Sequence, residues 1–245
     1  MNIKNSLRIR LVALIFVGAF VLLMIMLSRF SSKQSDGNNI IKPVSPTPSP
    51  TPVCHVVLDP GHGGYDRGAS GTRTGIGEAE INLAVARFTQ DLLIAKNYSV
   101  TLTRNDENAI AETKKEDMAK RRKLMHETGA DITVSIHMNK FKDSAVHGPM
   151  VFYTKGDTAS QTLADCIIQC LCNTLEIPKR HINTGNYYVI RDSKIPAVIV
   201  ECGFLSNPAE EEKLCNSEYQ MLLAHAISDG IDMYRLSVVR SSAEI

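Results

Sequence analysis

Between residues 53 and 237, short apolar runs alternate with longer segments whose apolar residues recur every three to four positions. The short runs are typical of strands and the longer segments of helices. This alternation predicts an α/β fold, a single three-layer domain with a mostly parallel, about six-stranded mixed sheet flanked by helices. The expected strands cover 53–59, 98–103, 131–137, 148–154 (a candidate edge strand), 187–190 and 197–202, and the expected helices cover 78–96, 114–127, 159–175, 208–216 and 219–236. The last eight residues, 238–245, are expected to fray.

The first thirty residues differ from this pattern. Lys4, Arg8 and Arg10 precede an unbroken apolar run from Leu11 to Leu27. As a helix this run is roughly 25 Å long, at the short end of what spans a bilayer. The basic flank predicts that residue 1 lies in the cytoplasm and that the rest of the chain lies outside. We expect 1–30 to be an uncleaved membrane anchor, and a cleaved signal peptide is the alternative.

Residues 31–52 read as a linker between this segment and the domain. Polar residues give way to a proline alternation at Pro43, Pro46, Pro48, Pro50 and Pro52. Such a sequence favours an extended polyproline II chain and cannot supply a packed core. An O-glycosylated or simply disordered linker is equally compatible with it.

Charge and cysteine content exclude several functions. The 27 Lys and Arg residues nearly balance the 26 Asp and Glu residues, for a formal net charge of +1, so no nucleic-acid partner is expected. A basic cluster at 120–123 has acidic neighbours, and we interpret it as a solvated helix face rather than a phosphate site.

The six cysteines are too few for a disulfide scaffold. We expect buried thiols, although a disulfide bridge from Cys54 or Cys215 stays open.

Polar and reactive residues follow three of the expected strands. The first strand runs into a glycine-rich loop with His62, the third ends at His137, and the last ends at Glu201. Glu78, at the start of the first expected helix, reaches the same rim if the loop folds back. In open α/β sheets, ligand groups gather beyond the carboxyl ends of the strands. Two imidazoles and a carboxylate there predict a zinc site with an open position, which leaves Glu201 to act as general base and then as acid for a leaving amine.

Each of these residues also has a simpler interpretation. A single histidine is more often a surface or hydrogen-bonded residue than a ligand. Glu78 alone could complement a helix dipole, and Glu201 alone could belong to a buried ion pair. The metal site therefore depends on all the groups meeting at one rim. The other histidines are not expected to be ligands: His55, His126, His147, His181 and His225.

Four ordered blocks resemble the zinc-dependent N-acetylmuramoyl-L-alanine amidases: VVLDPGHGG (56–64), EAEINLAVA (78–86), SIHMN (135–139) and IPAVIVECGFLSN (195–207). The resemblance implies zinc (Zn²⁺) held by His62, Glu78 and His137, with Glu201 as the catalytic carboxylate. It also implies hydrolysis of the amide between the lactyl group of muramic acid and L-alanine in peptidoglycan. Ala79 and Met138 depart from residues that are commoner in the family.

The layout of anchor, linker and one catalytic domain resembles the germination-specific amidases, which act in spore cortex on the route to muramic-δ-lactam. This implies a location on the extracytoplasmic face of the membrane, a peptidoglycan substrate and an activating protein as a candidate partner. The alternatives are a non-catalytic peptidoglycan-binding module, which would be expected to lack Glu201, a vegetative autolysin, or another peptidoglycan zinc hydrolase. Asn82 and Asp59 are expected to support the metal ligands. Arg191 has either a contact with the anionic stem peptide or a structural role.

Overall fold

The architecture is known from a computed structural model that describes residues 51–243. The expected anchor (1–30) and nearly all of the expected linker (31–52) lie outside the described residues, so both stay predictions. Among the described residues, no helix is long and apolar enough to cross a membrane. In chain order the elements are β1 (His55–Pro60), α2 (Glu78–Ala95), β2 (Ser99–Leu102), α3 (Lys114–Glu127), β3 (Ile132–Asn139), β4 (Met150–Tyr153), α4 (Thr158–Thr174), β5 (Asn183–Thr184), β6 (Ala197–Phe204), α5 (Pro208–Leu214) and α6 (Ser217–Ala243).

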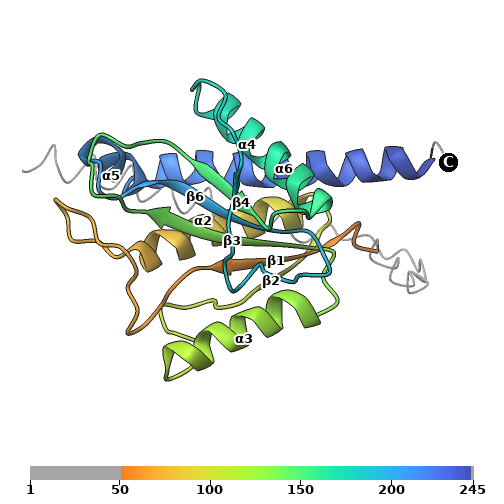
Figure 1. Ribbon diagram of the computed structural model, residues 1–245, viewed down its shortest axis with the longest axis horizontal. Coiled ribbons are helices and arrows are strands. Elements are labelled where there is room, and N and C mark those ends of the chain that lie inside the picture. Colours follow the sequence, from red (N-terminus) through yellow and green to blue (C-terminus); the bar gives the residue numbers. More distant parts are fainter. Residues whose placement is uncertain (1–50, 244–245) are drawn as a thin grey trace, which may run out of the picture. The chain divides into compact units, whose positions relative to one another are not determined.

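The six strands form one sheet in the order β2-β1-β3-β6-β4-β5. Strands β2, β1, β3 and β6 run parallel, and β4 pairs antiparallel with β6. Helices α2, α4 and α6 cover one face of this sheet and α3 covers the other (Figure 1). The three-layer α/β fold with a mostly parallel mixed sheet is therefore confirmed.

Alternation along the strands divides the sheet into a core face and a site face. Val56 and Leu58 of β1, like Val198 and Val200 of β6, pack under α2, α4 and α6. Val57 and Ile199, one position along, pack toward α3. Successive side chains of a strand point to opposite faces of the sheet, so residues an even number of positions from Val57 or Ile199 in the same strand also lie on the α3 face. This parity places Asp59, Ser135, His137 and Glu201 on the α3 side, with Cys202 in the core on the other.

The expected strand at 187–190 is wrong. These residues form a turn, in which the Tyr187 carbonyl accepts the amides of Ile190 and Arg191. Side chains satisfy the next carbonyls: Arg122 donates to the oxygen of Tyr188 and His126 bonds that of Val189, both at 2.8 Å. Val189 and Ile190 of this run are buried in the cluster that contains Met118 and Met125 of α3, so burial rather than strand pairing accounts for them. The two-residue β5 takes the sheet edge beside β4, which is therefore not the edge strand.

Helix α6 is longer than the expected helix at 219–236, because it runs from Ser217 to Ala243. Within this last stretch the hydroxyls of Ser237 and Ser241 bond carbonyls one turn back in the helix. All six cysteines are unpaired, in agreement with the expectation of thiols.

Helices α4 and α6 approach each other closely at Gly230. A Cβ atom added there would lie 2.5 Å from the Cα of Ile167, which is fully buried. Real Cβ atoms do not come that near to backbone, so glycine sets the distance between the two helices.

We predict that Gly230→Ala lowers the free energy of unfolding by about 1–3 kcal/mol, because the added methyl forces the helices apart. The higher helix propensity of alanine, worth about 1 kcal/mol, acts in the opposite direction. Urea denaturation would measure the change, with His225→Ala on the exposed face of the same helix as control. A Gly230→Ala protein as stable as the control would contradict this account of the contact.

Candidate metal centre

His62 comes from the loop that follows β1 and has a left-handed backbone, with φ of 62°. This conformation is uncommon for a residue with a side chain and persists only where the surroundings hold it. Here Arg121 donates to the carbonyl oxygen of His62. The preceding Gly61 lets the loop lie on the neighbouring strand, since a Cβ there would be 2.1 Å from the ring of His137. The glycine therefore brings the two imidazoles together.

Glu78 opens α2, where the partial positive charge of the helix N-terminus favours a carboxylate. Its side chain is buried, and it accepts hydrogen bonds from the amides of Ala69 at 2.8 Å and Met138 at 3.1 Å. Asn82, one turn later in α2, donates to the same carboxylate at 3.2 Å. Burial would raise the pKa of Glu78, but the bonds from His137 and His62 outweigh it and lower the pKa.

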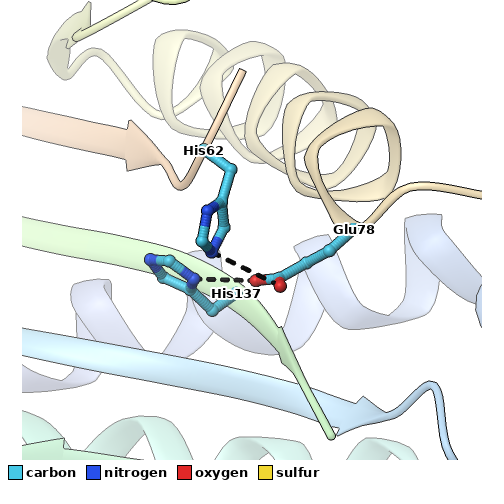
Figure 2. A group of neighbouring side chains, drawn as sticks. All are labelled: His62, Glu78 and His137. Carbon is cyan, nitrogen blue, oxygen red and sulfur yellow. Dashed lines mark hydrogen bonds and ion pairs between the residues drawn. The ribbon is translucent and has the colours of Figure 1, made fainter. Parts of the chain in front are cut away.

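The three expected ligands meet at one point, although they come from a loop, the first turn of a helix and a strand. His137 Nδ1 lies 2.8 Å from Glu78 Oε1, and His62 Nε2 lies 3.4 Å from Glu78 Oε2 (Figure 2). The two imidazole rings meet edge to face, with centroids 5.0 Å apart. One nitrogen or oxygen from each residue lies within 4.8 Å of the others, which fits a shared metal ion.

Glu201 lies beside this group without joining it. It is the strand neighbour of His137 in the β3–β6 pairing, and both line a cavity of about 310 Å³. Its Oε2 atom is buried and has no hydrogen-bond partner among the described residues. Burial raises the pKa of Glu201. The nearby imidazoles of His137 and His62 oppose this rise, whereas the negative charge of Glu78 adds to it. The result is a carboxyl group that holds a proton more readily than usual, next to the candidate metal ligands.

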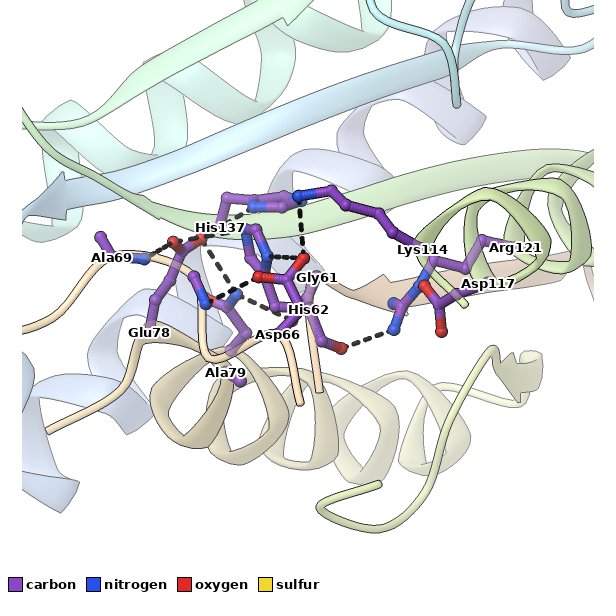
Figure 3. Close-up of polar contacts among 12 residues, drawn as sticks. Gly61, His62, Asp66, Ala69, Glu78, Ala79, Lys114, Asp117, Arg121 and His137 are labelled. Carbon is purple, nitrogen blue, oxygen red and sulfur yellow. Dashed lines mark hydrogen bonds and ion pairs between the residues drawn. The ribbon is translucent and has the colours of Figure 1, made fainter. Parts of the chain in front are cut away.

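Asp66 contacts His62 from the side away from Glu78, and the sequence analysis missed it. Its carboxylate lies 3.0 Å from His62 Nδ1 and 3.1 Å from the ammonium of Lys114 (Figure 3). A carboxylate on the far nitrogen of a ligand histidine fixes which nitrogen faces the metal. Its place four residues after His62 in a glycine-rich loop was the only available signal.

Arg121 is buried, so the interpretation of 120–123 as a solvated face is wrong at this position. Its guanidinium pairs with Asp59 at 2.9 Å and Asp117 at 2.6 Å, and donates to the carbonyl of Pro60 at 2.7 Å as well as to that of His62. One side chain therefore ties α3 to the loop that carries the first histidine. The sequence did contain a signal, because Met118, Arg121 and Met125 share the helix face that packs on the sheet.

A second buried arginine supports the same loop. Arg104, after β2, donates to the carbonyls of Pro60 at 2.9 Å, Gly61 at 3.0 Å and Ala79 at 2.8 Å. It joins the loop after β1 to the first turn of α2, which carries Glu78. No local pattern marked this residue.

Glu211 of α5 fixes the loop between His62 and Glu78 from the outside. Its two oxygens accept the amides of Thr72, Arg73 and Thr74 and both threonine hydroxyls, at 2.7–3.0 Å. Burial would raise the pKa of this carboxyl, but these hydrogen bonds lower it to about 2. Earlier in the same loop, Gly68 lies against Glu78 and His62, where a Cβ would be 2.5 Å from Glu78 Oε2. The loop thus packs directly on two candidate ligands.

The residues that the sequence analysis singled out around the metal ligands differ in whether they contact a candidate ligand. Asn82 contacts Glu78 as expected. Asp59 contacts no candidate ligand and instead holds Arg121, Ser135 and Thr103. Arg191 lies outside the cavity and stacks on Tyr188. Met138 donates its amide to Glu78 while its side chain is buried in the opposite core, so this departure from the family pattern leaves the site intact.

The arrangement defines a class of protein. The open α/β sheet brings two imidazoles, a carboxylate and a separate buried carboxyl group to one rim. This arrangement is typical of metal-dependent hydrolases. The donor set of two nitrogens and one oxygen fits zinc, and the unpartnered oxygen of Glu201 fits a reacting group beside it. The chain belongs to the N-acetylmuramoyl-L-alanine amidase family, whose sequence profile matches residues 56–233.

Individual relatives agree with this assignment. The CwlD amidase of Clostridioides difficile, solved in complex with the GerS lipoprotein, is similar with a TM-score of 0.72 and 33% identity, over 76% of this chain and 99% of that one. The uncharacterized protein YqiI of Bacillus subtilis is 36% identical over 181 residues, 73% of this chain and 84% of that protein. An uncharacterized cell wall amidase of Bacillus anthracis is 33% identical over 185 residues, 72% of this chain but only 34% of that protein.

We predict that Arg121→Lys weakens zinc binding roughly 10–100-fold, because lysine cannot reproduce the guanidinium contacts that hold the His62 loop. Competition with a chelator of known affinity would measure the change, with Lys123→Gln on the exposed side of α3 as control. Unchanged affinity in a folded Arg121→Lys protein would show that the loop keeps its shape without this arginine.

We predict that Glu211→Gln lowers the free energy of unfolding by about 2 kcal/mol near neutral pH, through the loss of charged hydrogen bonds. Because the pKa of Glu211 is depressed to about 2, this contribution is complete above about pH 4.5, where the unfolded carboxyl is also ionised. It declines as the pH falls toward 2. Denaturation at several pH values would therefore show the two proteins converging in acid, and a difference independent of pH would contradict the role of the charge.

Proposed function

We propose that this protein is a zinc-dependent N-acetylmuramoyl-L-alanine amidase, which hydrolyses the amide between the lactyl group of muramic acid and L-alanine in peptidoglycan. The observation that carries the proposal is the meeting of His62, Glu78 and His137 within 4.8 Å beside the buried, unpartnered carboxyl of Glu201. Membership of the amidase family supports the choice of bond. The proposed metal ligands are His62, Glu78 and His137, and the proposed catalytic residue is Glu201.

The roles follow from the positions of the side chains. When bound, zinc would supply polarisation of the amide carbonyl and a lower pKa for a water molecule at the site. Glu201 accepts a proton from the attacking water and delivers it to the alanine nitrogen, so that water is added across the bond and an acid and an amine leave. Its raised pKa suits a group that must both take and return a proton. Asp66 and Asn82 keep the ligand side chains oriented.

The cellular setting extends the proposal. We infer that residues 1–30 direct the domain to the extracytoplasmic face of the membrane, where it stays anchored or is secreted after cleavage. We also infer that the enzyme acts in spore cortex on the way to muramic-δ-lactam. The similarity to CwlD supports this role. Because CwlD has been solved with the GerS lipoprotein, we also propose that an activating protein binds this chain.

We predict that Glu201→Gln abolishes turnover, by about three orders of magnitude or more, while zinc stays bound. Gln keeps the size of the side chain but can neither accept nor return the proton. Purified peptidoglycan would be digested and free L-alanine amino termini counted, with metal content measured on the same samples. Lys123→Gln should keep full activity.

Two further arms separate the parts of this proposal. Removal of zinc by a chelator should stop the release of L-alanine termini, and added zinc should restore it. If wild-type protein loaded with zinc releases other ends or none, even with a cell extract to supply an activator, the choice of bond is wrong. A Glu201→Gln protein with near-full activity would overturn only the role of that residue.

A further inference from the structure

Two arginines stack on Tyr188, a residue that lines the cavity. The guanidinium carbon of Arg122 lies 5.1 Å from the ring centroid of Tyr188, and that of Arg191 lies 5.6 Å from it. Arg122 comes from α3, whereas Arg191 follows the turn that contains Tyr188. Arg122 also donates to the carbonyl oxygen of Tyr188 at 2.8 Å, which fixes the turn to the helix.

This pair carries a positive charge that its neighbours only partly balance. Asp192 is the one carboxylate of residues 51–243 in ionic contact with either arginine, and its distances are long, at 3.5 Å from Arg122 and 3.7 Å from Arg191. The Asp192 side chain is 74% exposed, so water screens it. Within the same part of the chain, the guanidinium of Arg191 has no hydrogen-bond partner. Its donors therefore face solvent, ready for a ligand.

The tyrosine connects these arginines to the proposed centre of reaction. Tyr187, Tyr188 and Val189 line the same cavity as His137 and Glu201. The ring of Tyr187 packs edge to face on Phe152 of β4, with centroids 5.3 Å apart, which secures the turn against the sheet. The cations that line the cavity are Lys114, which is paired with Asp66, and Arg121, which is paired with Asp59 and Asp117. The positive charge that is not fully balanced is therefore that of the two arginines stacked on Tyr188.

We propose that Arg191, with Arg122 beside it on Tyr188, binds a carboxylate of the substrate's peptide a short distance beyond the amide that is cut. This subsite rests on the proposed amidase function and deepens it. A peptide attached to a sugar through its amino end has carboxylates on the far side of that bond, whereas an N-acetylated sugar ring has none. The planar guanidinium fork binds a carboxylate through two parallel hydrogen bonds. The subsite thus selects substrates with acidic rather than amidated peptides.

The test uses soluble peptidoglycan fragments before and after their carboxylates are converted to amides with carbodiimide and ammonia. We expect wild-type enzyme to prefer the acidic fragments roughly ten-fold in kcat/KM, mainly through KM. Arg191→Gln should lose this preference while it keeps the wild-type rate on the amidated fragments. Arg191→Lys, which keeps the charge but not the fork, should fall between them. Lys123→Gln removes a charge from the exposed side of α3, outside the cavity, and should leave the preference unchanged.

The outcomes distinguish the subsite from the function on which it rests. If Arg191→Gln loses kcat/KM equally on both substrates, or keeps the wild-type preference, the proposed subsite is wrong. The residue would then support the turn or contact the sugar. If wild-type enzyme releases no L-alanine amino termini from either substrate, the amidase proposal itself fails. Thermal unfolding of each variant shows whether a lost preference reflects lost structure.

Discussion

The buried guanidinium of Arg121 is the interaction on which the site depends. A charge in a protein interior is unfavourable unless partners surround it, and Arg121 has two carboxylates and two carbonyl oxygens. These partners lie on β1, on the loop after it and on α3, so one residue joins a strand, a loop and a helix from different layers. The uncommon backbone of His62 is held in place by this network. Removal of the arginine would leave Asp59 buried without its charged partner.

Much of the fold could be predicted because its signals are local. The central strands are apolar runs bounded by turn residues, and the expected and observed bounds of α3 coincide at Lys114 and Glu127. The short run at 187–190 could not be assigned from the sequence, since a short apolar run suits a half-buried turn as well as a strand. Only the carbonyl contacts from Arg122 and His126 distinguish the two. The C-terminal part of α6 was underestimated because its exposed residues lack an apolar repeat.

The meeting of a candidate metal ligand with Glu201 was predictable for a different reason. His137 and Glu201 lie near the carboxyl ends of neighbouring parallel strands, and such ends meet at one edge of the sheet. The residues that orient the ligands gave weaker signals, because their partners are distant in sequence or are backbone atoms. Asp66 reads as an ordinary loop residue, Arg104 as an ordinary surface cation, and Arg121 as one of four basic neighbours. Chemistry at a strand end is visible in a sequence, whereas the support beneath it becomes visible in three dimensions.

The contact between Glu211 and the loop at Thr72 joins residues 139 positions apart. A chain that is still being synthesised lacks this carboxylate until residue 211 has been added. The tip of the glycine-rich loop then lacks the hydrogen bonds that Glu211 accepts from residues 72–74. The loop that packs on two candidate ligands is therefore completed by a residue supplied far along the polypeptide.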